Sequence, residues 1–404
     1  MKTKVIVLLN QFLDATNQDR FDVDFKDDKI EIIFWSLIKL ENTKVYNKYK
    51  KKKKDFILRK NFVYIKSYTE LFYKIYRLNK NNLFLNFIGQ SILVNLAEYF
   101  LTMRGCIKLK VYKEEFYFTY DDKDKKVYQF KKIFEFGFLF AIKKFFHHFY
   151  KKIGLLLNNF IAITPKYFFV SNEYQLKECN AKRRKNVFKF QSMLITQSKR
   201  IIKLKRKFTK NFVYIDQEFE NSFESKVTRN KFNLINRTKY WNCINSIFDK
   251  IEKNYNSKIL IAAHFRRIKK SLPKINRKFN FHNTVELIYK SKLVIAHNST
   301  AVFYAIIFNK PMIFLDFKIL DSIALFNSKV TSGFSKYLGT SKIDIDIDYK
   351  YKIPYLNKFN LFKIKKKNYQ KFYKNFIGFR STSNKPKKLW LSISNNLNKI
   401  TTRE

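Results

Sequence analysis

The stretch from Asn283 to Leu315 constrains the fold more than any other part of the chain. It reads NTVELIYKSKLVIAHNSTAVFYAIIFNKPMIFL. Apolar residues at helical spacing follow Thr284, and KLVIA then has the pattern of a buried strand. A polar turn separates this strand from TAVFYAIIF, which predicts a second helix, and Asn309 to Pro311 end that helix before the apolar run MIFL. Alternating helices and strands predict an α/β protein with a parallel sheet.

The polar turn from His297 to Thr300 is a candidate phosphate site. Ser299 or Thr300 is a suitable N-cap for the helix that follows. A helix that begins after a parallel strand points its amino-terminal N–H groups at the carboxyl edge of the sheet, where phosphates bind. The alternative is an ordinary capped helix that binds nothing, and most single capped helices are of that kind.

Residues 291–315, SKLVIAHNSTAVFYAIIFNKPMIFL, resemble the donor-binding segment of the GT-B glycosyltransferases that build bacterial surface polysaccharides. Sialyltransferase-like and CDP-glycerol transferase-like families are among them. The resemblance lies in a strand, a Ser-Ser or Ser-Thr pair, a helix and a KP turn. KILIAAHFRR (258–267) adds a strand ending in His264, where these families carry His-Pro, and Phe265 replaces the proline. NFVYIDQ (211–217) is similar to the strand that opens the second domain in some members.

This resemblance implies an α/β fold of two Rossmann-like domains facing a cleft, the GT-B type. We expect an acceptor-side domain at 1–197, a basic linker at 198–210 and a nucleotide-donor-binding domain at 211–365. The helical segment 366–404 is expected to cross back to the first domain. Strand and helix patterns alternate in both halves of the chain, which agrees with this division.

In the first half, residues 2–9 predict a strand, and the polar stretch from Gln11 to Asp19 follows it. Asp14 lies there as a candidate catalytic carboxylate, with a loop carboxylate of no chemical role as the alternative. SYTELFYKIYRL predicts a helix behind a Ser or Thr cap. The alternating pattern from Cys106 to Tyr120 predicts a hairpin.

The resemblance implies a metal-independent transferase that moves a sugar, an acidic sugar among the candidates, from a nucleotide-activated donor to a cell-surface glycan or lipid-linked acceptor. The nucleotide phosphate gains negative charge as it leaves, and N–H groups, hydroxyls and a histidine can stabilise it. We expect no metal and no cofactor. The candidate catalytic residues are His264 and Asp14, and the candidate donor-binding residues are His297, Asn298, Ser299, Thr300 and Glu286. A polyol-phosphate transferase of the same fold is the alternative reaction.

The formal net charge of +51 over 404 residues raises a nucleic-acid-binding alternative, because clustered Lys and Arg neutralise phosphates. The lysines are spread along the whole chain among Asn, Ile, Phe and Tyr, as AT-rich codons would supply them, and no RNP, KH or helix-turn-helix signature appears. We therefore expect no nucleic-acid partner.

An anionic membrane surface is a further candidate partner. The basic aromatic segment 129–160 is one amphipathic candidate for membrane binding, and core packing is the alternative for that segment.

Three cysteines far apart in sequence match no zinc spacing and favour a reducing compartment. The amino-terminal sequence shows no secretory signal, and no apolar run reaches the roughly 20 residues of a membrane span. We expect a cytoplasmic protein, at most peripheral on the inner face of the membrane. Asp344, Asp346 and Asp348 superficially resemble a metal-binding DxD motif, but alternation with Ile predicts a charged edge strand instead.

Overall fold

The computed structural model describes the chain as two compact units. Among the described residues, the first unit holds those up to Met193 and those after Ser381, and the second holds those from Leu194 to Arg380. The described residues are 2–10, 21–43, 46–47, 59–88, 91–112, 164–181, 186–204, 207–219, 237–264, 267, 272–273, 275–281, 284–317, 327–346, 348, 350–353, 361–379 and 387–402. Asp14 and the segment 129–160 lie outside them.

The first unit is built on a seven-stranded sheet in the order β3-β2-β1-β4-β5-β6-β7, and every paired strand is parallel. The order of its first six strands is that of the Rossmann fold. The strands are β1 (Thr3–Leu9), β2 (Ile30–Ser36), β3 (Phe62–Tyr64), β4 (Leu83–Asn86), β5 (Ile107–Val111), β6 (Tyr167–Val170) and β7 (Val187–Lys189).

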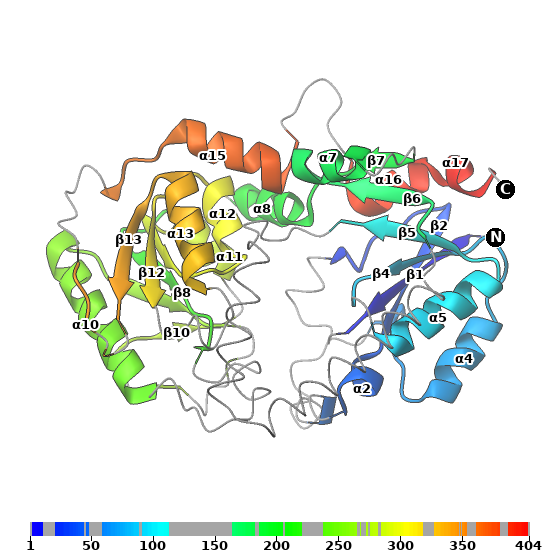
Figure 1. Ribbon diagram of the computed structural model, residues 1–404, viewed down its shortest axis with the longest axis horizontal. Helices are drawn as coiled ribbons and strands as arrows, with labels where there is room; N and C mark the ends of the chain where they lie inside the picture. Colours follow the sequence, from blue (N-terminus) through cyan, green and yellow to red (C-terminus); the bar gives the residue numbers. More distant parts are fainter. Residues whose placement is uncertain are drawn as a thin grey trace, which may run out of the picture. The chain divides into compact units, whose positions relative to one another are not determined.

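Both faces of this sheet are buried, as the alternation along β1 shows. Val5 and Val7 join one apolar core, whereas Ile6 and Leu8 join another on the opposite face. Helices α4 (Tyr68–Tyr76) and α5 (Ile92–Met103) cover the second face (Figure 1). The described helices of this unit also include α2 (Ile38–Glu41) and α7 (Glu173–Ala181).

The predicted cap of α4 is present, since the Ser67 hydroxyl accepts a hydrogen bond from the Glu70 N–H at 3.1 Å. Ser91 caps α5 in the same way, with its hydroxyl 3.1 Å from the Val94 nitrogen. In each case a serine satisfies an amide of the first turn that has no partner within the helix.

The other face of the first sheet is covered by the end of the described chain. Helices α16 (Leu389–Asn395) and α17 (Leu397–Thr401) contribute Trp390, Ile393 and Ile400 to that core. The indole N–H of Trp390 donates to the Phe21 carbonyl oxygen at 2.6 Å, across 369 positions in sequence. The first unit is therefore assembled from segments that lie before and after the second unit in sequence.

The second unit has a six-stranded sheet in the order β10-β9-β8-β11-β12-β13, and neighbouring strands in this order pair in parallel. This is the same Rossmann order, counted from β8. The strands are β8 (Phe212–Ile215), β9 (Ile259–Ala262), β10 (Phe279–Asn280), β11 (Leu293–Ala296), β12 (Met312–Phe317) and β13 (Ser341–Ile345).

Helix α10 (Arg237–Tyr255) covers one face of the second sheet and buries Trp241, Ile244 and Phe248 against it (Figure 1). The opposite face carries apolar residues of several helices. These are α8 (Met193–Lys203), α11 (Thr284–Lys290), α12 (Val302–Ile307), α13 (Asn327–Leu338) and α15 (Lys366–Phe372), which continues as the π-helix η5 (Tyr373–Ile377).

Two local predictions differ from the structure. Strand β5 pairs in parallel with β4 and β6, so the alternating pattern after Cys106 does not begin a hairpin. Residues 198–203, expected within a linker, belong to helix α8, because Leu194, Ile195 and Ser198 form a buried helical stripe beneath exposed Lys199 and Arg200.

The aspartate-rich segment forms the edge of the second sheet, as its alternation predicted. Ile343 and Ile345 are buried, whereas Asp344 is exposed and pairs with Lys342 at 2.7 Å. The strand ends at Ile345, and Asp346 instead accepts the backbone N–H groups of Asp348 and Lys350 in a turn. Among the described residues, no helix is long and apolar enough to cross a membrane.

Candidate functional site

The candidate site lies at the carboxyl edge of the second sheet. Strands β8 and β11 are neighbours, and the chain leaves β8 toward β9 on one side and β11 toward β12 on the other. In open α/β sheets this point of reversal is where ligands bind. Three groups meet the edge here: Asp216 to Glu218 after β8, His264 after β9, and His297 to Thr300 after β11.

Asp216 and Arg267 form a buried ion pair at this edge. The Arg267 Nε and Nη2 atoms lie 2.5 and 2.8 Å from the two carboxylate oxygens of Asp216. Arg267 is 4% exposed, and its guanidinium lies over the rings of Trp241 at 5.3 Å and Phe279 at 5.4 Å. The charges are thus held together in an environment that contains little water.

The Asp216 carboxylate also holds the backbone of the two neighbouring loops. It accepts the N–H of His264 at 3.1 Å and the N–H of Glu218 at 3.0 Å. The N–H of Arg267 donates to the carbonyl oxygen of His264 at 2.9 Å. The position of His264 is therefore fixed from both its amide and its carbonyl group.

His264 is half-buried, and its Nδ1 atom lies 3.7 Å from a carboxylate oxygen of Glu218. Glu218 is buried and adopts a φ angle of +53°, in the left-handed region that costs a residue with a side chain about 1 to 2 kcal/mol. Such strain is retained where the surroundings impose it, often at functional sites. A carboxylate beside a histidine can orient the imidazole ring.

His297 belongs to the core, which corrects its assignment as a donor-binding side chain. It is fully buried, its Nδ1 atom lies 2.7 Å from the Leu315 carbonyl oxygen, and its Nε2 atom lies 2.9 Å from the Tyr214 hydroxyl. Burial lowers the pKa of His297 to about 4. The ring is neutral at pH 7 and uses both nitrogens to join β11 to its neighbours.

The turn after His297 does present polar groups. Asn298 and Ser299 are half-buried and Thr300 is exposed. Neither hydroxyl caps α12, contrary to the prediction: the N-cap position is Ala301, without a side-chain hydrogen bond. The Ser299 hydroxyl instead accepts the Ala301 N–H at 3.3 Å, and the Ser299 carbonyl oxygen accepts the Val302 N–H, so a tight turn precedes the helix.

Two buried amide oxygens flank the point of reversal. Oδ1 of Asn298 after β11 and Oε1 of Gln217 after β8 have no hydrogen-bond partner in the described part of the chain. Because their strands are adjacent, both oxygens belong to the same stretch of the carboxyl edge. A buried acceptor without a partner carries a penalty of about 1 to 3 kcal/mol, and a hydroxyl or N–H of a ligand would remove it.

Glu286 lies in the first turn of α11 and pairs with Lys290 at 2.5 Å, one helical turn away. This contact already engages the carboxylate that was assigned to a ribose or base. Sequence reasoning missed Asp216, Gln217, Glu218 and Arg267. The available signal was weak, because Asp216 to Glu218 come directly after the strand FVYI but Arg267 follows the strand ILIA only after several residues. No cluster of His, Cys, Asp and Glu suited to a metal ion occurs within the described ranges.

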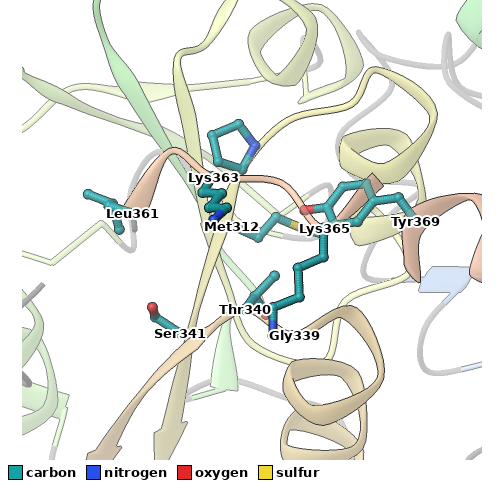
Figure 2. A pocket seen from close by; sticks show the side chains of 9 residues that line it. Met312, Gly339, Thr340, Ser341, Leu361, Lys363, Lys365 and Tyr369 are labelled. Carbon is teal, nitrogen blue, oxygen red and sulfur yellow. The ribbon is translucent and has the colours of Figure 1, made fainter. Parts of the chain in front are cut away.

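The second unit also contains a cavity of about 350 Å³ at the opposite edge of its sheet (Figure 2). Its lining includes Met312 and Ser341, the first residues of β12 and β13. Lys365 extends along Gly339, at the carboxyl end of α13, where a cation compensates the helix dipole. None of the candidate donor residues lines this cavity.

No protein-family model matches the chain, and no curated protein matches it in sequence. Solved structures do match. The wall teichoic acid polymerase TagF aligns with a TM-score of 0.50 and 12% identity, over 99% of this chain and 89% of that chain. The Methanocaldococcus jannaschii UDP-GlcNAc 2-epimerase in complex with UDP-GlcNAc and UDP aligns with a TM-score of 0.43 and 13% identity, over 92% of this chain and 98% of that chain. The spinosyn forosaminyltransferase SpnP aligns with a TM-score of 0.42 and 9% identity, over 99% of this chain and 94% of that chain.

The likeness to TagF shows the fold. The predicted fold class, α/β with two Rossmann-like domains of the GT-B type, is confirmed by the two parallel sheets and by this comparison. At 12% identity the comparison carries the fold alone.

Proposed function

We propose that the protein is a glycosyltransferase that moves a sugar from a nucleotide-activated donor to a cell-surface glycan or a lipid-linked acceptor. One observation carries the proposal. At the point of strand reversal in the second sheet, the buried Asp216–Arg267 pair holds His264 in place. On the neighbouring strands, Gln217 and Asn298 present amide oxygens that a ligand can satisfy.

The donor nucleotide lies along this edge in the proposed complex. His264 follows β9 and Ser299 follows β11, and β8 lies between them. Two strand spacings separate the chain at these positions, about 10 Å. A phosphate with its ribose can bridge this distance. Ribose hydroxyls and base N–H groups are the donors that Gln217 and Asn298 require.

The transfer breaks the bond between the anomeric carbon and the phosphate oxygen, and that oxygen keeps the electron pair. An acceptor hydroxyl oxygen forms the new bond to the anomeric carbon and loses its proton to a base. His264 would donate to the departing phosphate oxygen, and the hydroxyls of Ser299 and Thr300 would contribute further hydrogen bonds. Asp14 remains the candidate base from the sequence. The proposed reaction uses no metal.

Transfer of a polyol phosphate is the second candidate, because the same edge would stabilise the same departing nucleotide. The likeness in fold to a wall teichoic acid polymerase is a further reason to test polyol-phosphate transfer. We place the enzyme in the cytoplasm, at the inner face of the membrane. The three buried free cysteines, Cys106, Cys179 and Cys243, suit a reducing compartment.

Titration calorimetry of the purified protein with CMP, CDP, UDP and GDP tests the proposal. We expect one nucleotide to bind more tightly than the others, and its activated sugar to be consumed when acceptor lipid is added. Consumption of the corresponding nucleotide-activated polyol would favour the second candidate. If no nucleotide binds, while single-stranded DNA binds and is released by moderate salt, the protein is a nucleic-acid binder.

A further inference from the structure

The exposed aromatic side chains of the first unit gather on two adjacent helices. Six of the ten large apolar residues that the described surface exposes lie on α4 and α5. They are Tyr68, Tyr73, Tyr76, Tyr99, Phe100 and Met103, and we call them the α4–α5 patch. Tyr76 is 70% exposed and Met103 is 68% exposed.

The two helices form one continuous surface. Phe72 of α4 packs edge-on against Phe100 of α5 with ring centroids 5.0 Å apart. One turn further along, the Arg104 guanidinium lies 5.2 Å from the centre of the Tyr76 ring and donates to the Leu78 carbonyl oxygen. The contacts step by four residues on both helices, so the helices run in the same direction. Figure 1 shows them side by side.

The two helices and the residues that flank them carry more cations than acidic side chains. Between Lys66 and Arg104 the chain carries Lys66, Lys74, Arg77, Lys80 and Arg104, against two acidic residues. Glu98 is buried and bonded to Lys108, and Glu70 pairs with Lys74 at 3.8 Å. The exposed charge around the aromatic residues is therefore positive.

We infer that the α4–α5 patch is the surface by which the protein binds an anionic membrane. Tyrosine, phenylalanine and methionine between arginines and lysines suit the boundary between headgroups and acyl chains: rings enter the apolar layer while cations meet the lipid phosphates. This inference adds a binding surface in the first unit and does not depend on the donor site.

The contacts favour a membrane over nucleic acid. Base stacking needs open ring faces. Here Arg77 lies over one face of the Tyr73 ring at 5.5 Å and Arg104 lies over one face of the Tyr76 ring, so each ring has a single face left for stacking. Met103 offers no aromatic face at all. Charge complementarity with anionic headgroups accounts for the whole set.

Vesicle flotation tests the inference. The probes are vesicles of phosphatidylcholine alone and vesicles that also contain phosphatidylglycerol. We expect binding to the mixed vesicles only, partly retained at high salt because the apolar contacts are insensitive to it. Arg77→Gln and Arg104→Gln should each reduce the partition coefficient about fivefold. The triple variant Tyr76→Ser, Phe100→Ser, Met103→Ser should reduce it about tenfold or more.

Phe208→Ser is the matched control, because Phe208 is 66% exposed but lies outside the patch; it should bind mixed vesicles as the unaltered protein does. The inference is overturned if the unaltered protein does not float with mixed vesicles, or if the triple variant floats equally well. It is also overturned if the patch instead binds an oligonucleotide or a second copy of the chain. Calorimetry should show that the triple variant binds nucleotide as the unaltered protein does, so this test is independent of the proposed donor site.

Discussion

The carboxylate of Asp216 accepts two hydrogen bonds from the guanidinium of Arg267, and both side chains are buried at the carboxyl edge of the second sheet. The two residues are 51 positions apart in sequence, and their ion pair joins the loop after β8 to the loop after β9. The positive charge of Arg267 mainly compensates the negative charge of Asp216. The loops that carry Glu218 and His264 therefore depend on this pair for their conformation.

Removal of one partner should destabilise the second unit strongly. Arg267→Ala leaves the Asp216 carboxylate buried beside an empty space, and we expect a loss of about 3 to 5 kcal/mol in unfolding free energy. Urea denaturation followed by tryptophan fluorescence measures it. Arg59→Ala breaks an exposed ion pair with Asp24 and should cost about 0 to 1 kcal/mol. Equal losses in the two variants would contradict the structural role of the buried pair.

His264→Ala and Ser299→Ala should weaken nucleotide binding or turnover about tenfold or more. Each removes a hydrogen bond to a charged phosphate, which contributes about 1.5 to 3 kcal/mol. Calorimetry and initial rates measure the effect, and melting temperatures should change little because both residues lie at the edge of the sheet. Lys258→Ala is the control, since Lys258 is exposed before β9 at the opposite edge. Variants that bind like the unaltered protein would remove both residues from the site.

Glu218→Gly should separate stability from activity. Glycine adopts the left-handed conformation of residue 218 without strain, so we expect the unfolding free energy to stay the same or rise by about 1 kcal/mol. Turnover should fall about tenfold, because His264 loses its carboxylate neighbour. Asn256→Gly, at a second positive φ, is the control and should leave turnover unchanged. A Glu218→Gly variant of full activity would show that the strain serves folding only.

The stability of the second unit should fall as the pH decreases below 6.5. Burial lowers the pKa of His297 from 6.5 to about 4, so the unfolded chain binds a proton that the folded chain excludes. The contribution is complete above pH 6.5, declines toward pH 4 and amounts to about 3 kcal/mol in total. Urea unfolding across this range should show a shallower pH dependence for His297→Gln. Parallel curves for the two proteins would contradict the buried, neutral ring.

Trp390→Ala should destabilise the first unit by about 3 to 5 kcal/mol, because it empties a large site in the core and leaves the Phe21 carbonyl oxygen without its donor. The neighbouring change Leu391→Ala is the control, since Leu391 is 37% exposed. Thermal unfolding monitored separately for each unit, through residue-specific probes, measures both. If the Trp390 variant were as stable as the Leu391 variant, helices α16 and α17 would contribute little to the stability of the first unit.

The repeating pattern of strands and helices could be predicted from the sequence because parallel strands buried on both faces appear as short apolar runs, such as FVYI, ILIA and LVIA. The hairpin predicted at β5 was wrong because the prediction also relied on a burial pattern. An alternating pattern indicates which residues are buried, but it does not indicate the direction of the partner strand. Only the distant β6, which begins at Tyr167, makes β5 a central parallel strand.

The candidate site could be predicted only in outline. The sequence placed polar residues after β9 and β11, yet it could not distinguish His297, whose ring points into the core, from Asn298 one position later. Asp216 and Arg267 escaped notice because their importance arises from a contact between distant loops. A charged residue after a strand is common, and nothing local shows that it will be buried with a partner.

The return of residues 387–402 to the first unit has a consequence for biosynthesis. Domains usually fold in the order in which the ribosome delivers them. Here the sheet of the first unit is translated before the second unit, but Trp390, Ile393 and Ile400 complete one of its cores only after the second unit has been translated. The second unit, whose described residues all lie between Leu194 and Arg380, can fold before the first is finished. Until residues 387–402 are made, the nascent chain therefore lacks part of the apolar cover of this sheet face, and a chaperone that shields apolar surface would raise the yield of the folded protein.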